Sequence, residues 1–232
     1  MITLDNIFYR VADLLGKDQY GKYVTPRNFN QNLIWCNLQL MDKYIKEFEA
    51  TREVSTNLRP FLKTLGTPED PKLALDSWGR ALMPDDYYYY SSGYTSAFLN
   101  VCGGYTETQN MLEWVDNETF RFRIDRDMAT VDYPIITYTT IKQSGGNYLA
   151  AVQVFPIKKS VAVTYLRRPT DPVFGYTTTA GTVIYDPTTS VPLEWPESAQ
   201  DDFVELMVQC YARSIQDQFS YQVSNAQEAK QG

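Results

Sequence analysis

Apolar residues recur every three or four positions in two stretches near the start of the chain. The first stretch places Ile7, Val11 and Leu14 on one helical face. The second follows Thr25-Pro26, where a threonine N-cap precedes a proline at the first helical position. Its apolar stripe consists of Phe29, Leu33, Cys36, Leu40 and Tyr44. We therefore predict two amphipathic helices, and a further helical segment over residues 55–66.

A third amphipathic pattern begins near Pro196, towards the other end of the chain. Its apolar face consists of Phe203, Leu206, Met207, Cys210, Tyr211 and Ile215. Residues 197–205 carry four acids and no base, and the helix dipole stabilises acids at this end. Proline suits the first helical position, and Trp195 just before it is expected to pack back onto the apolar face. Local structure alone therefore explains why a tryptophan, a proline and several acids occur at the start of this C-terminal helix.

Between these helical stretches the apolar period changes to about two residues. Residues 119–125 (TFRFRID) alternate strictly between apolar and polar positions, which predicts a half-buried strand. Residues 134–142 and 148–155 flank Gly145-Gly146-Asn147 and predict a β-hairpin. Two further predicted strands cover residues 160–169 and 181–186.

These patterns together predict an α+β fold, in which a central, mostly antiparallel β module is inserted into a helical part. We expect N- and C-terminal amphipathic helices to pack together as this helical part, which comprises residues 1–66 and 193–221. The β-rich module covers residues 67–192, and residues 222–232 form a polar C-terminal tail. A chain of 232 residues is long enough to bury a core.

The composition argues against catalysis. Histidine is absent, which removes the commonest general base and the commonest metal ligand. Cys36, Cys102 and Cys210 lack the paired spacing of a zinc site or a disulfide framework, so we interpret them as unreactive thiols. The sequence also lacks the usual phosphate-binding and nucleophile motifs. We expect no enzymatic activity, no cofactor and no metal.

The charge and the hydropathy restrict the partners. The formal net charge is −7, which disfavours tight nucleic-acid binding because that affinity rests on lysine and arginine. No apolar run approaches the roughly 20 residues that cross a bilayer, and residues 1–18 lack the features of a signal peptide. We therefore expect a protein that is made and kept in a bacterial or host cytoplasm, without a membrane partner.

Two groups of residues are candidates for a functional surface. Residues 84–94 (PDDYYYYSSGY) contain Tyr87, Tyr88, Tyr89 and Tyr90, and such clusters suit protein interfaces and carbohydrate sites. A strand with tyrosines on both faces is the simpler interpretation. Acid pairs such as Asp201-Asp202 could hold a divalent cation or serve a glycosidase, whereas solvated or helix-capping acids are the simpler interpretation.

Several stretches, in the same order over most of the chain, carry a family resemblance. They are IFYRVADLLGKDQYGKYVTPRNFN, LRPFLK, MPDDYYYY, YLRRPTDPVFGY, VIYDPTTSVPLEWPES and the final amphipathic helix. In combination they resemble the head–tail connector, or portal-proximal ring, proteins of short-tailed bacteriophages, particularly of the crAss-like type. Each stretch has residues typical of a turn, a strand end or a helix start, and none is a catalytic signature.

The resemblance implies a structural virion protein that forms a homo-oligomeric ring between portal and tail, extends the DNA channel and docks further tail proteins. Its implied partners are the portal protein, other ring or tail proteins, and viral DNA that passes without specific binding. The implied location is the tail or portal vertex of the virion, after assembly in the host bacterial cytoplasm.

Under this interpretation the candidate assembly or channel residues are Tyr87, Tyr88, Tyr89, Tyr90, Trp195, Asp201 and Asp202. The alternatives are another tail or capsid-surface structural protein, and a glycan-binding module that uses the tyrosine-rich β region.

Overall fold

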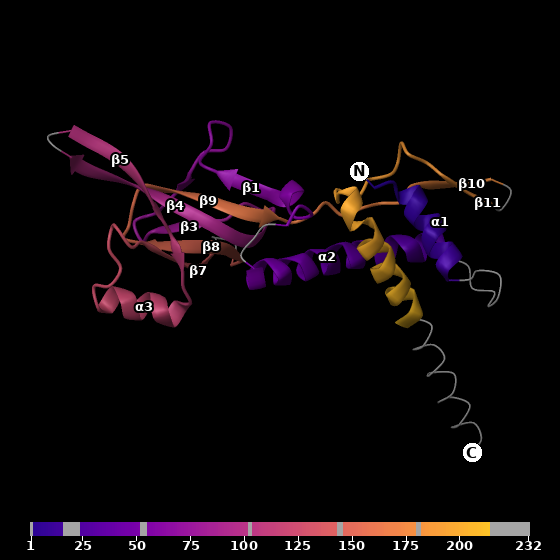
Figure 1. Ribbon diagram of the computed structural model, residues 1–232, viewed down its shortest axis with the longest axis horizontal. Helices are drawn as coiled ribbons and strands as arrows, with labels where there is room; N and C mark the ends of the chain where they lie inside the picture. Colours follow the sequence, from indigo (N-terminus) through magenta and orange to yellow (C-terminus); the bar gives the residue numbers. More distant parts are fainter. Residues whose placement is uncertain are drawn as a thin grey trace, which may run out of the picture. The chain divides into compact units, whose positions relative to one another are not determined.

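The computed structural model describes residues 2–15, 24–51, 55–101, 104–142, 146–179 and 182–213, with side chains for all of these except 97–101 and 104–108. The chain divides into two compact units (Figure 1). The helical unit is formed by residues 1–60 with 169–232, and the β unit by residues 61–168. The predicted polar tail, Cys102 and Ile215 lie outside the described residues.

The helical unit is built from both ends of the chain. Its elements are α1 (Leu4–Leu14), α2 (Pro26–Thr51), the paired strands β10 (Tyr176–Thr179) and β11 (Thr182–Tyr185), the 3₁₀ turn η2 (Glu197–Ala199) and a C-terminal helix over residues 200–213. The predicted apolar stripe of α2 is buried along its whole length. Phe203 and Met207 of the C-terminal helix are buried as well. The amphipathic helices are thus confirmed, although Leu14 at the end of α1 is 64% exposed.

An aromatic cluster connects the first two helices to residues 169–192. Phe8 of α1 and Phe29 of α2 pack against Phe174, with ring centroids 4.8 and 5.3 Å from its own. The Asn30 side chain accepts a hydrogen bond from the backbone N–H of Phe174 at 2.7 Å and donates one to its carbonyl oxygen at 3.0 Å. These contacts explain why residues 169–192 belong to the helical unit, whereas the sequence analysis placed them in the β-rich module.

The β unit contains two sheets. One sheet has the order β1 (Leu62–Leu65), β9 (Ser160–Arg167), β4 (Tyr87–Val101), β5 (Gly104–Met111), with β2 (Leu73–Ala74) also paired to β9. The other has the order β3 (Arg80–Leu82), β8 (Tyr148–Phe155), β7 (Ile135–Lys142), β6 (Glu113–Trp114). Among the described strands only β6 and β7 pair in parallel. The mostly antiparallel module and the β7–β8 hairpin are therefore confirmed.

The core of the β unit lies between the two sheets. Val161 and Val163 of β9 and Val152 and Val154 of β8 are buried in one apolar cluster. Because residues two apart on a strand point to the same side, these residues define the two inner faces. A smaller apolar cluster lies on the outer face of the second sheet, beneath α3 (Asn117–Asp125).

The strand predicted for residues 119–125 is wrong, because these residues form most of α3. The Asp116 carboxylate caps this helix by accepting a hydrogen bond from the backbone N–H of Thr119 at 2.8 Å. Phe120 and Ile124, four residues apart, share the helical face that packs into the smaller cluster. Phe122, which alternation placed on the same side, is 53% exposed. An alternating pattern of three apolar residues thus fitted both a strand and a short helix, and the capping residue distinguishes the two.

The helical segment predicted for residues 55–66 is also wrong. The chain forms a single 3₁₀ turn, η1 (Arg59–Phe61), and then enters β1. Leu62 to Leu65 pair antiparallel with β9, where Leu65 lies opposite Val163. The backbone groups that would continue a helix are therefore used in the sheet.

Candidate functional site

The tyrosine run lies at the start of β4 in the β unit. Its register against β9 shifts between Tyr87 and Tyr89 and again between Tyr90 and Ser92. These irregularities allow both Tyr87 and Tyr90 to face the core, where Tyr90 is 7% exposed and Tyr87 is half-buried. Tyr88 and Tyr89 are half-buried as well.

The inward-facing tyrosines belong to an aromatic cluster between the two sheets. The ring of Tyr90 packs on Trp114 at 4.6 Å, and Trp114 packs on Tyr138 at 4.3 Å between centroids. The hydroxyl groups of Tyr87 and Tyr138 are hydrogen-bonded to each other. Tyr87 and Tyr90 therefore contribute to the core of the β unit, and their rings are engaged by other aromatic side chains rather than open for a sugar to stack on.

Trp195 lies in the helical unit and is fully buried. Its indole N–H donates a hydrogen bond to the Asn37 side-chain oxygen at 2.7 Å. The Asn37 amide in turn donates to the carbonyl oxygen of Thr170 at 3.1 Å. The Trp195 ring also contacts Tyr44, with centroids 5.6 Å apart. Trp195 therefore belongs to the core, where it packs against α2, and not to a surface of this unit.

Two acids of the C-terminal helix, Asp201 and Asp202, connect it to the first two helices. Tyr44 donates a hydrogen bond to the Asp202 carboxylate at 2.7 Å, and the Lys43 ammonium lies 3.0 Å from the same oxygen. Both interactions lower the pKa of the Asp202 carboxyl below its usual value. Asp201 forms an ion pair with Arg10 of α1 at 2.8 Å, but its side chain is 85% exposed. Asp202 therefore connects the C-terminal helix to α2, whereas Asp201 remains at the surface.

We predict that Asp202→Asn lowers the free energy of unfolding by about 1 kcal/mol, because it weakens the hydrogen bond from Tyr44 and removes the ion pair with Lys43. Asp201→Asn, the matched control, is expected to change it by less than about 0.5 kcal/mol because its ion pair is exposed. Since the pKa of Asp202 is lowered in the folded state, its contribution is present above the unfolded value of about 3.9 and is lost as the pH falls through the folded pKa. Urea unfolding at several pH values measures both effects. Equal losses of unfolding free energy in the two variants would contradict a stabilising role of Asp202 between the two helices.

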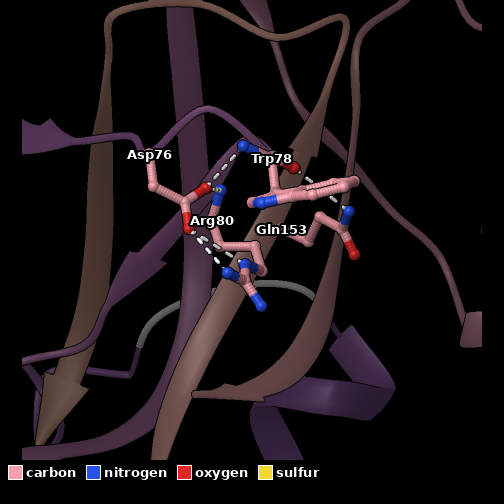
Figure 2. Close-up of polar contacts among 4 residues, drawn as sticks. All are labelled: Asp76, Trp78, Arg80 and Gln153. Carbon is pink, nitrogen blue, oxygen red and sulfur yellow. Dashed lines mark hydrogen bonds and ion pairs between the residues drawn. The ribbon is translucent and has the colours of Figure 1, made fainter. Parts of the chain in front are cut away.

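Trp78, which no sequence pattern had identified as a candidate, lies in the turn formed by Asp76–Gly79. Trp78 is 68% exposed. The Asp76 carboxylate accepts hydrogen bonds from the backbone N–H groups of Trp78 and Arg80, both at 2.8 Å, and from the Arg80 guanidinium (Figure 2). On the other side, the Gln153 amide donates to the Trp78 carbonyl oxygen at 3.2 Å (Figure 2). The backbone that presents Trp78 is therefore fixed on both sides.

Gly79 holds this turn against β8. Its φ is +72°, and a Cβ atom there would lie 2.5 Å from the carbonyl oxygen of Val154 and 3.2 Å from the Ile157 side chain. Ile157 is itself 50% exposed. We call Trp78 and Ile157 the Trp78 patch. The sequence DSWG has an acid at the first position of a turn and a glycine at the fourth. This pattern could have predicted the turn that exposes Trp78.

A second exposed aromatic residue lies on α2. Trp35 is 43% exposed and its neighbour Ile34 is 38% exposed. At 100° per residue, Trp35 points away from the buried stripe of this helix. We call Ile34 and Trp35 the Trp35 patch. It belongs to the helical unit, whereas the Trp78 patch belongs to the β unit.

The β unit also has a polar groove beside α3, with a volume of about 680 Å³. Its lining includes Asn117, Arg121 and Asp125 of α3 together with Thr139 and Gln153 of the sheet. No group of three or more histidine, cysteine or acidic side chains that could hold a metal ion occurs among the described residues. The amide, guanidinium, carboxylate and hydroxyl groups of the lining residues offer hydrogen bonds to a polar ligand.

No protein-family model matches the chain, and a search of the curated proteins finds no match. Within the described ranges, no helix is long and apolar enough to span a membrane. Of the candidate residues, Trp195 and Asp202 come together around Tyr44 of α2. The tyrosine run lies in the other unit.

Proposed function

We propose that this chain is a structural virion protein that forms a ring between the portal and the tail of a short-tailed bacteriophage. In this role it extends the DNA channel and provides a docking surface for further tail proteins. The observation that carries the proposal is the pair of exposed aromatic patches, one on each unit.

Ring formation needs two different contact surfaces on each subunit. In a head-to-tail ring, one surface of a subunit binds the other surface of its neighbour, and closure of the rotation fixes the copy number. We assign these two roles to the Trp35 patch and the Trp78 patch, which are exposed and, because they lie on separate units, are distinct surfaces. Tryptophan is enriched among the residues that dominate binding energy at protein interfaces, and a rigid backbone lowers the entropy cost of binding.

The packing of the helical unit also supports the proposal. Phe8 and Phe29, at the two ends of the first resembling stretch, share one aromatic cluster with Phe174 from a second stretch that is far away in the sequence. Trp195, from a third stretch, is bound by Asn37 in the same unit. Three of the resembling stretches thus contribute to the core of the helical unit, which is compatible with a shared fold.

The charge suits a conduit through which DNA passes. A net charge of −7 repels phosphates, so DNA would slide past the protein without the counterion release that drives binding. Asp202 is engaged between helices, whereas Asp201 and Glu205 are exposed on the C-terminal helix. We assign the channel-facing role to these exposed acids.

The copy number in purified virions tests the proposal directly. Quantitative mass spectrometry against the major capsid protein is expected to give on the order of a dozen copies per particle for a closed ring. Hundreds of copies would instead favour a capsid-surface protein. Absence from the particle would refute a structural role in the virion.

We predict that Trp78→Ala and Trp35→Ala each weaken self-association of the purified chain at least about tenfold, because each removes an aromatic anchor from one contact surface. Native mass spectrometry over a concentration series measures the effect. The matched control is Tyr133→Ala, since Tyr133 is 73% exposed in the β unit but lies outside both patches. If the two patches bind each other, an equimolar mixture of the two tryptophan variants forms dimers that neither variant forms alone.

The polar groove beside α3 favours a second candidate function, glycan binding. Its charged and amide side chains, such as Arg121 and Gln153, match the hydroxyl groups of a sugar. This location differs from the tyrosine run, whose inward-facing rings are packed in the core. A glycan array separates the two functions, because binding that is lost in Arg121→Ala and is independent of oligomeric state would favour a glycan-binding module over a ring protein.

A further inference from the structure

Two cysteines that are far apart in the sequence meet in the helical unit. The Sγ atom of Cys36 on α2 lies 2.9 Å from the Sγ atom of Cys210 on the C-terminal helix. Both are free thiols, and one donates a hydrogen bond to the other. The spacing of the cysteines along the chain shows no pairing, and on that basis they were expected to be unreactive. Spacing along a chain does not reveal a contact between two helices that pack together.

The two helices are held together beside this contact. Figure 1 shows the C-terminal helix, in yellow, lying across α2. Asn37, the residue after Cys36, binds Trp195, and Asp202 of the C-terminal helix binds Lys43 and Tyr44 of α2. Because these contacts fix both helices, the two sulfur atoms meet in the folded protein without any rearrangement of the backbone.

The two thiols differ in accessibility and in acidity. Cys36 is completely buried, whereas Cys210 is partly exposed. The hydrogen bond between them and burial raise the pKa of the Cys36 thiol. The same hydrogen bond, together with the nearby positive charge of Arg213, lowers the pKa of Cys210. Cys210 is therefore the thiolate that a reagent from solvent can reach, and Cys36 is the thiol placed to react with it afterwards.

We infer that Cys36 and Cys210 are an oxidisable pair that forms a disulfide bond when a disulfide oxidant such as oxidised glutathione is present. The Cys210 thiolate attacks one sulfur of oxidised glutathione, and one glutathione thiolate leaves. Cys36 then loses its proton and attacks the Cys210 sulfur, and the second glutathione thiolate leaves. The two protein thiols are oxidised, oxidised glutathione is reduced to two glutathione molecules, and these take up the two protons.

The bond would link the C-terminal helix covalently to α2. It closes a loop that contains the whole β unit, because residues 61–168 lie between the two cysteines. A cross-link over so long a loop restricts the unfolded chain strongly, so we expect oxidation to raise the Tm by about 5 °C or more. Treatment with a reductant is expected to reverse this shift.

The experiment treats the full-length folded chain with oxidised glutathione, blocks the remaining thiols with iodoacetamide and digests without reduction. Trypsin cuts after lysine and arginine except before proline, so the expected product joins residues 28–43 to residues 168–213. Mass spectrometry identifies this linked product, and thermal unfolding measures the shift in Tm. The expected result is the linked product together with a higher Tm in the wild type and in Cys102→Ser.

Two variants make the assignment specific. Cys210→Ser removes the reactive thiol and Cys36→Ser removes the second one, so neither should form the link or gain in Tm on oxidation. Cys210 is partly exposed, which makes its substitution the less disruptive of the two. The inference is overturned if glutathione stays attached to Cys210 while Cys36 remains free, if Cys102 takes part in the link, or if no thiol reacts.

Discussion

Replacing Trp195 by alanine is expected to lower the free energy of unfolding of the helical unit by about 3–5 kcal/mol. The side chain is fully buried, so its removal leaves a large cavity next to Tyr44. It also leaves the Asn37 side-chain oxygen without the hydrogen bond that it accepts at 2.7 Å. A buried polar group that loses its partner adds a further cost.

Denaturant unfolding, followed by far-ultraviolet circular dichroism, measures this loss. Trp78→Ala is the matched control, because the same side chain is removed from a position that is 68% exposed. We expect Trp78→Ala to change the free energy of unfolding by less than about 0.5 kcal/mol. Comparable losses in the two variants would show that Trp195 does not have the central packing role assigned to it.

The second large effect is expected for Gly79→Ala, which should destabilise the β unit by about 2–4 kcal/mol. The new Cβ atom would lie 2.5 Å from the carbonyl oxygen of Val154, at a backbone φ of +72° that alanine rarely adopts. The turn would have to move away from β8, which breaks the hydrogen bond from the Val154 N–H to the Gly79 carbonyl oxygen. The Trp78 patch would lose its fixed position at the same time.

Gly146→Ala separates the two causes of this effect. Gly146 also has a positive φ, +87°, but no atom lies within 4 Å of its hypothetical Cβ. Its substitution therefore reports the conformational cost alone, about 1 kcal/mol. The difference between the two variants measures the steric clash with β8, and a difference near zero would contradict the close packing of the Trp78 turn.

The sequence predicted the elements whose apolar period extends over many residues. The stripe from Phe29 to Tyr44 spans several turns and admits only a helix. Residues 134–142 and 148–155 are rich in β-branched and aromatic residues and flank a glycine turn, which favours a hairpin. Residues 119–125 carry just three apolar positions, which fit a strand or a short helix equally well. There the hydrogen bond between Asp116 and Thr119 and the packing of Phe120 decide the structure.

The candidate residues were harder to place, because burial depends on partners that are remote in the sequence. Trp195 was expected to pack back onto the apolar face of the C-terminal helix, whereas its ring contacts Tyr44 and its indole N–H binds Asn37, both on α2. Tyr90 is buried because Trp114 lies on it. The contact between Cys36 and Cys210 likewise results from tertiary packing alone. Composition and spacing contain no information about such pairs.

The insertion of the β unit between the two halves of the helical unit has a consequence for biosynthesis. α2 ends at Thr51, whereas its packing partner Trp195 is translated 144 residues later. At roughly 5–20 residues per second, the end of the apolar stripe at Tyr44, which Trp195 contacts, stays without this partner for about 7–30 s. Residues 61–168 leave the exit tunnel during this interval, so the β unit can fold first while the nascent helical half awaits its C-terminal partner.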